Sequence, residues 1–417
     1  MAHKLYLTVP LAILIVVSFC DPCCGQIVAQ LPAPTGQYAV GRQLFAWTDE
    51  TRHEPTSEDL ALRRELVVYV WYPAAAPTGE PASYLEPAQS QITAFGNIYV
   101  SAWKAVQDDA IKTHAWKNAK LAVAHRPFPL LVFSPGLGSP TAAYIFLLED
   151  LASHGYIVAA VEHTHVSAPV AFPDGHIVAM DFGLGGPRLA DDDQVDFTSR
   201  EMRAVDLCAA DLQFVLDEIT KLSKDRQSIF FRRVDIERAA VFGHSVGGRV
   251  AVRACQRDPR FRSCLNEDGT LFYEPFVPDD TGKLLAQPFM MIDHKDAPLP
   301  DALFQQMHTT REQYDQMRSQ KIEAAQRTIY RSVLGGSYEV TISVPDAVHG
   351  SFSDLALLRA TTDTQAAHQM RIMQLDRLYT RRFFDLCLRK DQSEVLSDSD
   401  GEATVRTFKP AFVSSPR

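Results

Sequence analysis

The stretch AAVFGHSVGGRV, residues 239–250, places an apolar run typical of a buried strand directly before a serine surrounded by glycines. Its centre has the form G-x-S-x-G, with Ser245 in the middle. A sharp strand-to-helix turn leaves no room for side chains two places before and after that serine, which explains Gly243 and Gly247. The pattern predicts a nucleophile elbow that lifts the Ser245 hydroxyl above a sheet. A glycine-rich helix start without chemistry is the alternative interpretation.

The apolar runs on either side of this stretch are short and continuous, as in strands buried on both faces of a parallel sheet. Helical stretches separate most of them. This alternation predicts an α/β fold of the α/β-hydrolase type: a mostly parallel central sheet with helices on both faces and the elbow at Ser245. The expected strands are 37–47, 63–74, 129–136, 155–163, 238–244, 262–268, 288–293 and 338–344.

The ends of the chain differ in composition from its middle. Residues 5–17 form an apolar stretch after Lys4 that is too short to span a bilayer of ~30 Å, so we expect a secretory signal peptide over residues 1–25. The mature protein would then be secreted or periplasmic, with a membrane anchor as the alternative. The remaining expected units are a single domain over 26–390, insertions near 89–126 and 297–331 that either cover a pocket mouth or decorate the surface, and a poorly ordered tail over 391–417.

The charge balance of the chain is acidic. The formal net charge is −10, and no run of lysine and arginine interrupts it. A nucleic-acid partner needs a basic face, so none is expected. Four cysteines follow the predicted signal peptide, and export makes disulfides possible. Cys255 and Cys264 are the expected pair, with buried free thiols as the alternative.

A serine hydroxyl is a poor nucleophile unless a base accepts its proton, and in this fold the chain order is serine, acid, histidine. The candidate histidines after Ser245 are His294, His308, His349 and His368. His349 follows the last predicted strand in SVPDAVHGSFSD, at the sheet edge where open α/β sheets have their sites, so it is the predicted base. The residues alone leave the acid open between Asp268, after the strand that follows the elbow, and Asp293 or Asp296, after the next strand.

Acyl transfer also needs N–H groups that stabilise an oxyanion. The N–H of Val246 lies at the positive end of the helix after the elbow, and the N–H of Leu137 lies in the glycine-rich loop FSPGLGSP. That loop lacks the lysine and the spacing of a phosphate-binding P-loop. Glu162, His163 and His165 follow a strand without a fourth ligand, so neither a metal nor any other cofactor is expected.

Five blocks along the chain share a resemblance to one family. They are RPFPLLVFSPGLGSP, LEDLASHGYIVAAVEHTH, AAVFGHSVGG, CLNEDG and VHGSFSD. In this order they resemble the plasma-type platelet-activating-factor acetylhydrolases and their secreted microbial relatives, from about Pro34 to the last helix. The resemblance implies that Asp268 is the acid and that the substrates are phospholipids with short or oxidised acyl chains, cleaved without calcium. The EHTH segment at 162–165 and both insertions depart from the mammalian pattern.

Together these observations predict a serine esterase for the sn-2 ester of platelet-activating-factor-like phospholipids. Ser245, Asp268 and His349 would form the triad, an acyl-enzyme the intermediate, and Leu137 and Val246 the oxyanion hole. The expected partner is a small-molecule ester or a phospholipid, which can lie at a lipid surface, and no obligate protein partner is inferred. The alternatives are a secreted carboxylesterase or polyester hydrolase with the same triad, or a non-catalytic binding module with this fold.

Overall fold

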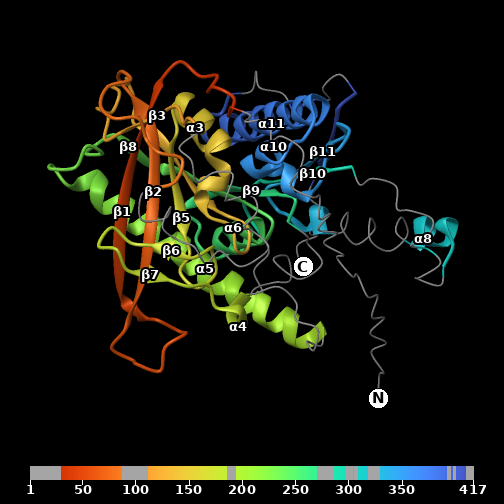
Figure 1. Ribbon diagram of the computed structural model, residues 1–417, viewed down its shortest axis with the longest axis horizontal. Helices are drawn as coiled ribbons and strands as arrows, with labels where there is room; N and C mark the ends of the chain where they lie inside the picture. Colours follow the sequence, from red (N-terminus) through yellow and green to blue (C-terminus); the bar gives the residue numbers. More distant parts are fainter. Residues whose placement is uncertain are drawn as a thin grey trace, which may run out of the picture.

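The computed structural model describes residues 30–86, 111–185, 194–269, 285–295, 304, 309–317, 329–391, 396–397 and 401–409. Within them a ten-stranded sheet crosses the molecule, with helices on both faces (Figure 1). Its strands are β1 (Ala39–His53), β2 (Arg63–Ala74), β3 (Ala115–Lys117), β4 (Phe128–Ser134), β5 (Ile157–Glu162), β8 (Val234–His244), β9 (Phe261–Glu267), β10 (Phe289–His294), β11 (Ser337–Ile342) and β12 (Ala403–Phe408). A separate two-stranded ribbon joins β6 (Val170–Ala171) and β7 (Ile177–Val178).

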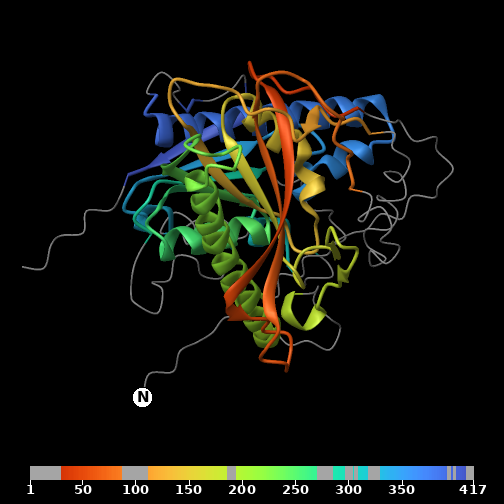
Figure 2. The ribbon, with the colours of Figure 1, turned by 90° about the vertical axis from the view of Figure 1, so that its left-hand side faces the viewer.

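The strand order is β12-β11-β10-β9-β8-β4-β5-β2-β1-β3. The six strands from β11 to β5 run parallel to one another. β2 pairs antiparallel with both β5 and β1. The long strands β1 and β2 twist strongly around each other (Figure 2). The expected α/β-hydrolase type of fold, with a mostly parallel sheet, is therefore confirmed, and every strand predicted from the apolar runs is present.

Helices cover both faces of the sheet because successive side chains of a strand point to opposite sides. In β4, Leu131 and Phe133 pack toward the core under α3 and α11, whereas Leu130 and Val132 pack toward α5 and α6. The part of the chain that the structure describes has no helix that is both long and apolar enough to cross a membrane. The helices are α3 (Ile145–Ser153), α4 (Phe182–Gly185), α5 (Gln194–Lys224), α6 (Val246–Arg257), α8 (Arg311–Met317), α10 (Asp354–Leu358) and α11 (Asp363–Phe384).

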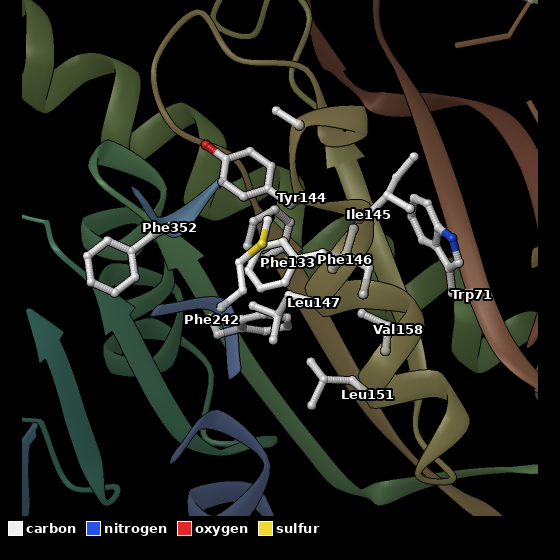
Figure 3. Packing of buried hydrophobic residues seen from close by; sticks show 14 of the residues in the cluster. Trp71, Phe133, Tyr144, Ile145, Phe146, Leu147, Leu151, Val158, Phe242 and Phe352 are labelled. Carbon is white, nitrogen blue, oxygen red and sulfur yellow. The ribbon is translucent and has the colours of Figure 1, made fainter. Parts of the chain in front are cut away.

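An aromatic cluster fills the core under α3 and extends toward the carboxyl ends of the strands (Figure 3). The ring of Phe133 lies 4.9 Å from that of Tyr144 and 4.8 Å from that of Phe242, measured between centroids. Such pairs contribute about 0.5–1.5 kcal/mol beyond the area they bury. Because all three rings are fully buried, the Tyr144 hydroxyl is held at a fixed place next to the elbow.

The expectation of a poorly ordered tail after residue 391 was wrong for residues 403–408. These residues form β12, which pairs antiparallel with β11 at the sheet edge, and Arg406 Nε lies 2.6 Å from Glu339 Oε2. Of the first predicted insertion, residues 115–117 form the short edge strand β3. The predicted signal peptide and much of both insertions lie outside the described residues.

The expected disulfide between Cys255 and Cys264 is also not formed, since all four described cysteines carry free thiols. Cys255, on α6, and Cys264, on β9, are both fully buried. Burial raises the pKa of the Cys255 thiol, and its hydrogen bond with the Cys264 thiol raises it further. The two side chains therefore pack as small apolar groups within the core.

Candidate active site

Ser245 lies in the turn between β8 and α6, as the glycine pattern predicts. Its backbone has φ 57° and ψ −125°, a strained conformation for a residue with a side chain, which typically costs about 1–3 kcal/mol. A Cβ atom at Gly247 would lie 2.1 Å from the carbonyl oxygen of Ser134, and one at Gly243 would lie 2.4 Å from the carbonyl oxygen of Gly247. Only glycine fits these two positions, so the packing of β4 against α6 dictates the motif.

Three residues from separate elements are joined by hydrogen bonds at the carboxyl end of the parallel strands. His349 Nε2 lies 2.9 Å from Ser245 Oγ, and His349 Nδ1 lies 2.6 Å from Asp268 Oδ2. His349 begins the 3-10 turn η3 (His349–Phe352) after β11, and its side chain is 53% exposed. Asp268 directly follows β9, and its side chain is only 12% exposed. The structure thus brings together the serine and histidine predicted from the residues and the aspartate that the family resemblance implies.

Asp268 is fixed in both position and charge. Its N–H donates to the carbonyl of Ile292, at 2.7 Å, and its φ of 53° turns the chain sharply after β9. Both of its carboxylate oxygens lie 3.2 Å from His294 Nδ1. Burial alone would raise the pKa of Asp268, but the hydrogen bonds from His294 and His349 outweigh it and lower the pKa to about 2. An ionised carboxylate only accepts, so His349 donates through Nδ1 and its Nε2 faces Ser245 as an acceptor.

The other carboxylate and histidine candidates have different neighbours. Asp293, on β10, is mostly buried, and burial raises its pKa to about 7. Among the alternative bases, His368 Nδ1 lies 2.7 Å from Asp346 Oδ2, while His294 contacts Asp268 as a second histidine beside His349. Asp296 and His308 lie outside the described residues. Sequence reasoning considered His294 only as a base, because no local pattern reveals that the ends of β9 and β10 bring it to Asp268.

The loop after β4 lies against the elbow. A Cβ atom at Gly136 would be 3.4 Å from Ser245 Cβ, so the loop backbone passes beside the serine. The N–H groups on either side of Leu137 are anchored: Gly136 donates to Tyr144 Oη and Gly138 to the carbonyl of Val166, each at 3.0 Å. Across the serine, Val246 is the first residue of α6, where backbone N–H groups have no acceptor within the helix.

A second Ser-His-Asp arrangement lies beneath this loop. His163 Nε2 is 3.0 Å from Ser134 Oγ, and His163 Nδ1 is 2.9 Å from Asp211 Oδ2. All three side chains are buried, at 1% exposure or less for each residue, so no substrate can reach the hydroxyl. Arg64 donates to both oxygens of Asp211, at 3.2 and 2.7 Å. This arrangement has the connectivity of a triad but the surroundings of a structural polar network.

The same network bears on the metal ligands considered from the sequence. His163, Cys208 and Asp211 lie close enough together to hold a metal ion, but Asp211 already accepts from the Arg64 guanidinium, whose charge repels a cation. Glu162 accepts hydrogen bonds from the N–H and the hydroxyl of Thr141. These hydrogen bonds hold the end of β5 against Arg64, Asp211 and Thr141.

The parallel sheet and the serine at its elbow define an α/β-hydrolase. A solved structure shares the fold: a ferulic acid esterase from Streptomyces cinnamoneus superposes with a TM-score of 0.64 at 28% identity, covering 91% of this chain and 99% of that one. The model of the family described as platelet-activating factor acetylhydrolase, isoform II, matches residues 25–174 and 215–369. The chain belongs to this family, which confirms the resemblance seen in the five sequence blocks.

Single relatives match only part of this chain. The platelet-activating factor acetylhydrolase of Bos taurus is 30% identical over 194 residues, which is 43% of this chain and 42% of the bovine protein. The corresponding protein of Cavia porcellus is 24% identical over 319 residues, 72% of this chain and 67% of that protein. The match to the bovine protein thus spans less than half of its length.

Proposed function

We propose that this protein is a serine ester hydrolase in which Ser245 is the nucleophile, His349 the general base and Asp268 the acid that orients it. One observation carries the proposal: the unbroken hydrogen-bonded series from Asp268 through His349 to Ser245, at 2.6 and 2.9 Å, on a serine lifted out of the sheet. A nucleophile and base within hydrogen-bond reach, with the base oriented by a third group, is the arrangement that acyl transfer requires.

In the first half of the reaction, His349 Nε2 accepts the Ser245 proton while Oγ attacks the ester carbonyl carbon. The N–H groups of Leu137, in the loop that passes beside Ser245, and of Val246, at the start of α6, would hold the oxyanion. The intermediate then collapses, and the bond between the carbonyl carbon and the alcohol oxygen breaks. His349 gives its proton to the departing alcohol, which leaves an acyl group on Ser245.

In the second half, a water molecule replaces the alcohol. His349 accepts a proton from this water as its oxygen attacks the acyl carbon, and the same N–H groups hold the second oxyanion. Collapse releases the carboxylic acid, and the proton on His349 returns to Ser245 Oγ. Throughout the cycle the ionised Asp268, whose pKa is about 2, stabilises the imidazolium that forms twice.

For the substrate, we propose phospholipids that carry a short or oxidised acyl chain at the sn-2 position, as in platelet-activating factor. Family membership and the activity for which the bovine and guinea-pig relatives are named support this choice. The match to a ferulic acid esterase over 91% of the chain favours a second candidate, a carboxylesterase for simple or aromatic esters. We also propose that the protein is exported and that it meets its substrate at a lipid surface.

Replacement of the serine tests the chemistry. Ser245→Ala should lower kcat by ~10⁴-fold or more and abolish labelling by a fluorophosphonate, without a change in the melting temperature beyond a few degrees. Ser134→Ala is the matched control, because Ser134 also contacts a histidine that contacts an aspartate, but it is buried. This control should keep its activity and its labelling. A Ser245→Ala protein that still hydrolyses esters at the wild-type rate would rule out the proposal.

A substrate panel then separates the two candidates. Initial rates are compared for phosphatidylcholines with acetyl or oxidised sn-2 chains, for nitrophenyl esters of rising chain length, and for methyl ferulate. We expect kcat/KM to be highest for the phosphatidylcholines with short or oxidised chains. Hydrolysis of the simple or aromatic esters with the phospholipids untouched would assign the carboxylesterase activity instead.

A further inference from the structure

Three hydrogen bonds cross the site beneath Ser245. The N–H of Gly136 donates to Tyr144 Oη at 3.0 Å, Tyr144 Oη lies 2.9 Å from His244 Nδ1, and His244 Nε2 lies 3.0 Å from the backbone carbonyl oxygen of His349. The first residue belongs to the loop that carries Leu137, and the last is the proposed base. The series therefore joins the two halves of the site, and it passes through the residue directly before the nucleophile.

The direction of each bond follows from what each group can donate. A carbonyl oxygen only accepts, so His244 must carry its proton on Nε2 to bond with His349. A neutral imidazole protonated at Nε2 has an acceptor at Nδ1, which requires Tyr144 to donate its hydroxyl proton to it. The tyrosine oxygen in turn accepts from the Gly136 N–H. All three bonds point the same way, from the β4 loop toward His349.

The two side chains in the middle are held rigidly. Tyr144 is fully buried and His244 is 5% exposed. The His244 ring lies 5.6 Å from the Tyr144 ring and 6.0 Å from the Phe352 ring, between centroids. Burial, together with the neighbouring His349, lowers the pKa of His244 to about 3, so that the imidazole is neutral near pH 7.

His349 itself needs such support. Its side chain is 53% exposed and it stands at the start of a short 3-10 turn, yet Nε2 must stay within hydrogen-bond reach of Ser245. We propose that Tyr144 and His244 are positioning residues that fix the β4 loop and the His349 backbone relative to each other across Ser245. This inference rests on the proposed function. A displacement of about 1 Å at a reacting group can cost on the order of 10²-fold in rate.

The test uses paired substitutions in the full chain, with nitrophenyl acetate as the substrate. His244→Phe keeps a ring but removes both hydrogen bonds, whereas His244→Gln keeps an acceptor and a donor on one flat amide. Tyr144→Phe removes the hydroxyl alone. Tyr156→Phe is the matched control, since Tyr156 is equally buried and its hydroxyl bonds Asp385 at 2.7 Å, far along the chain from the elbow.

We expect His244→Phe to lower kcat by ~10²-fold with KM within threefold of wild type, because the reacting groups are misplaced and binding is not. His244→Gln should recover most of that loss, and Tyr144→Phe should lower kcat by ~10-fold. Combining Tyr144→Phe with His244→Phe should cost no more than His244→Phe alone, since the two act as one series. Tyr156→Phe should keep the wild-type kcat.

Several outcomes would overturn the inference. One is a His244→Phe enzyme within threefold of wild type, and another is a His244→Gln enzyme no better than His244→Phe. Losses that multiply in the double variant, or an equal loss in Tyr156→Phe, would also do so. If His244→Phe does not fold, His244→Gln and Tyr144→Phe still decide the matter. Activity that survives Ser245→Ala would instead refute the proposed function, so the two failures can be told apart.

Discussion

At the scale of single residues, the site depends on which of two neighbouring strand ends presents its carboxylate to His349. Asp268 directly follows β9, and Asp293 lies near the end of the adjacent parallel strand β10; both are largely shielded from solvent. Their surroundings shift their pKa values in opposite directions. Two histidines hold the pKa of Asp268 at about 2, whereas burial raises that of Asp293 to about 7. Only a carboxylate that is ionised at neutral pH can stabilise an imidazolium during the reaction.

Asparagine substitutions at these two positions should therefore differ in effect. Asp268→Asn should lower kcat by ~10³–10⁴-fold, because an amide can donate to His349 Nδ1 and so favours the wrong tautomer. Asp293→Asn is the matched control and should stay within a few-fold of wild type. Steady-state kinetics on nitrophenyl acetate, with melting curves to confirm folding, measure both. A larger loss in Asp293→Asn than in Asp268→Asn would transfer the acid to the other strand.

The elbow glycines allow a second comparison at this scale. A Cβ atom at Gly247 would lie 2.1 Å from the Ser134 carbonyl oxygen and 2.4 Å from that of Pro135, whereas one at Gly350 would meet nothing within 4 Å. Gly247→Ala should destabilise the fold by about 2–3 kcal/mol and displace Ser245, so that kcat falls as well. Gly350→Ala should have the same urea midpoint as the wild-type protein. Equal midpoints for the two variants in urea would contradict the steric explanation.

At the scale of elements, the apolar runs predicted the parallel strands because a strand covered on both faces has no polar alternation to disguise it. The edge strand β12, ATVRTF at residues 403–408, escaped prediction since it is short, alternates polar side chains and follows a polar stretch. The contact between Ser245 and His349 was predictable because a local motif marks the first residue and a strand end the second. The partnership of Tyr144 with His244 was not, because it joins residues 100 positions apart through the fold alone.

Truncation tests the contribution of β12. Removing residues 401–417 deletes the antiparallel partner of β11 together with the Arg406–Glu339 ion pair, and exposes the β11 edge to solvent. We expect the free energy of unfolding to fall by on the order of 2 kcal/mol or more. Removing residues 410–417 alone takes away no described contact and serves as the control. Denaturant melts that coincide for the two truncations would show that β12 adds no stability.

At the scale of the whole molecule, several acidic side chains are buried without a strong cationic partner. Burial raises the pKa of Asp293 and Asp354 to about 7 and that of Asp376 to about 8. It also raises the pKa of Glu267, which the neighbouring Asp376 on α11 raises further. These groups therefore hold protons in the folded state at pH values where the unfolded chain, with ordinary carboxyl pKa values near 4, has released them.

The sign of the resulting pH dependence follows from proton counting. A raised carboxyl pKa gives stability that is complete below about pH 4 and is lost as the pH rises through the folded-state value. Buried His163 and His244, whose pKa values burial lowers, act in the opposite direction, since their stability is lost as the pH falls below about 6.5. The two effects partly cancel between about pH 4 and 6.5, so the acids dominate above that range.

The free energy of unfolding should consequently fall between pH 6.5 and about pH 8, by ~1.4 kcal/mol per pH unit for each extra proton held by the folded state. Urea unfolding curves at a series of pH values measure this slope. Glu267→Gln and Asp376→Asn should each make it shallower, because a neutral amide has no proton to lose. Glu237→Gln, at a side chain 85% exposed, should leave it unchanged. A slope that is flat in wild type, or unaltered by both core substitutions, would mean that the buried pair is already ionised in the folded protein.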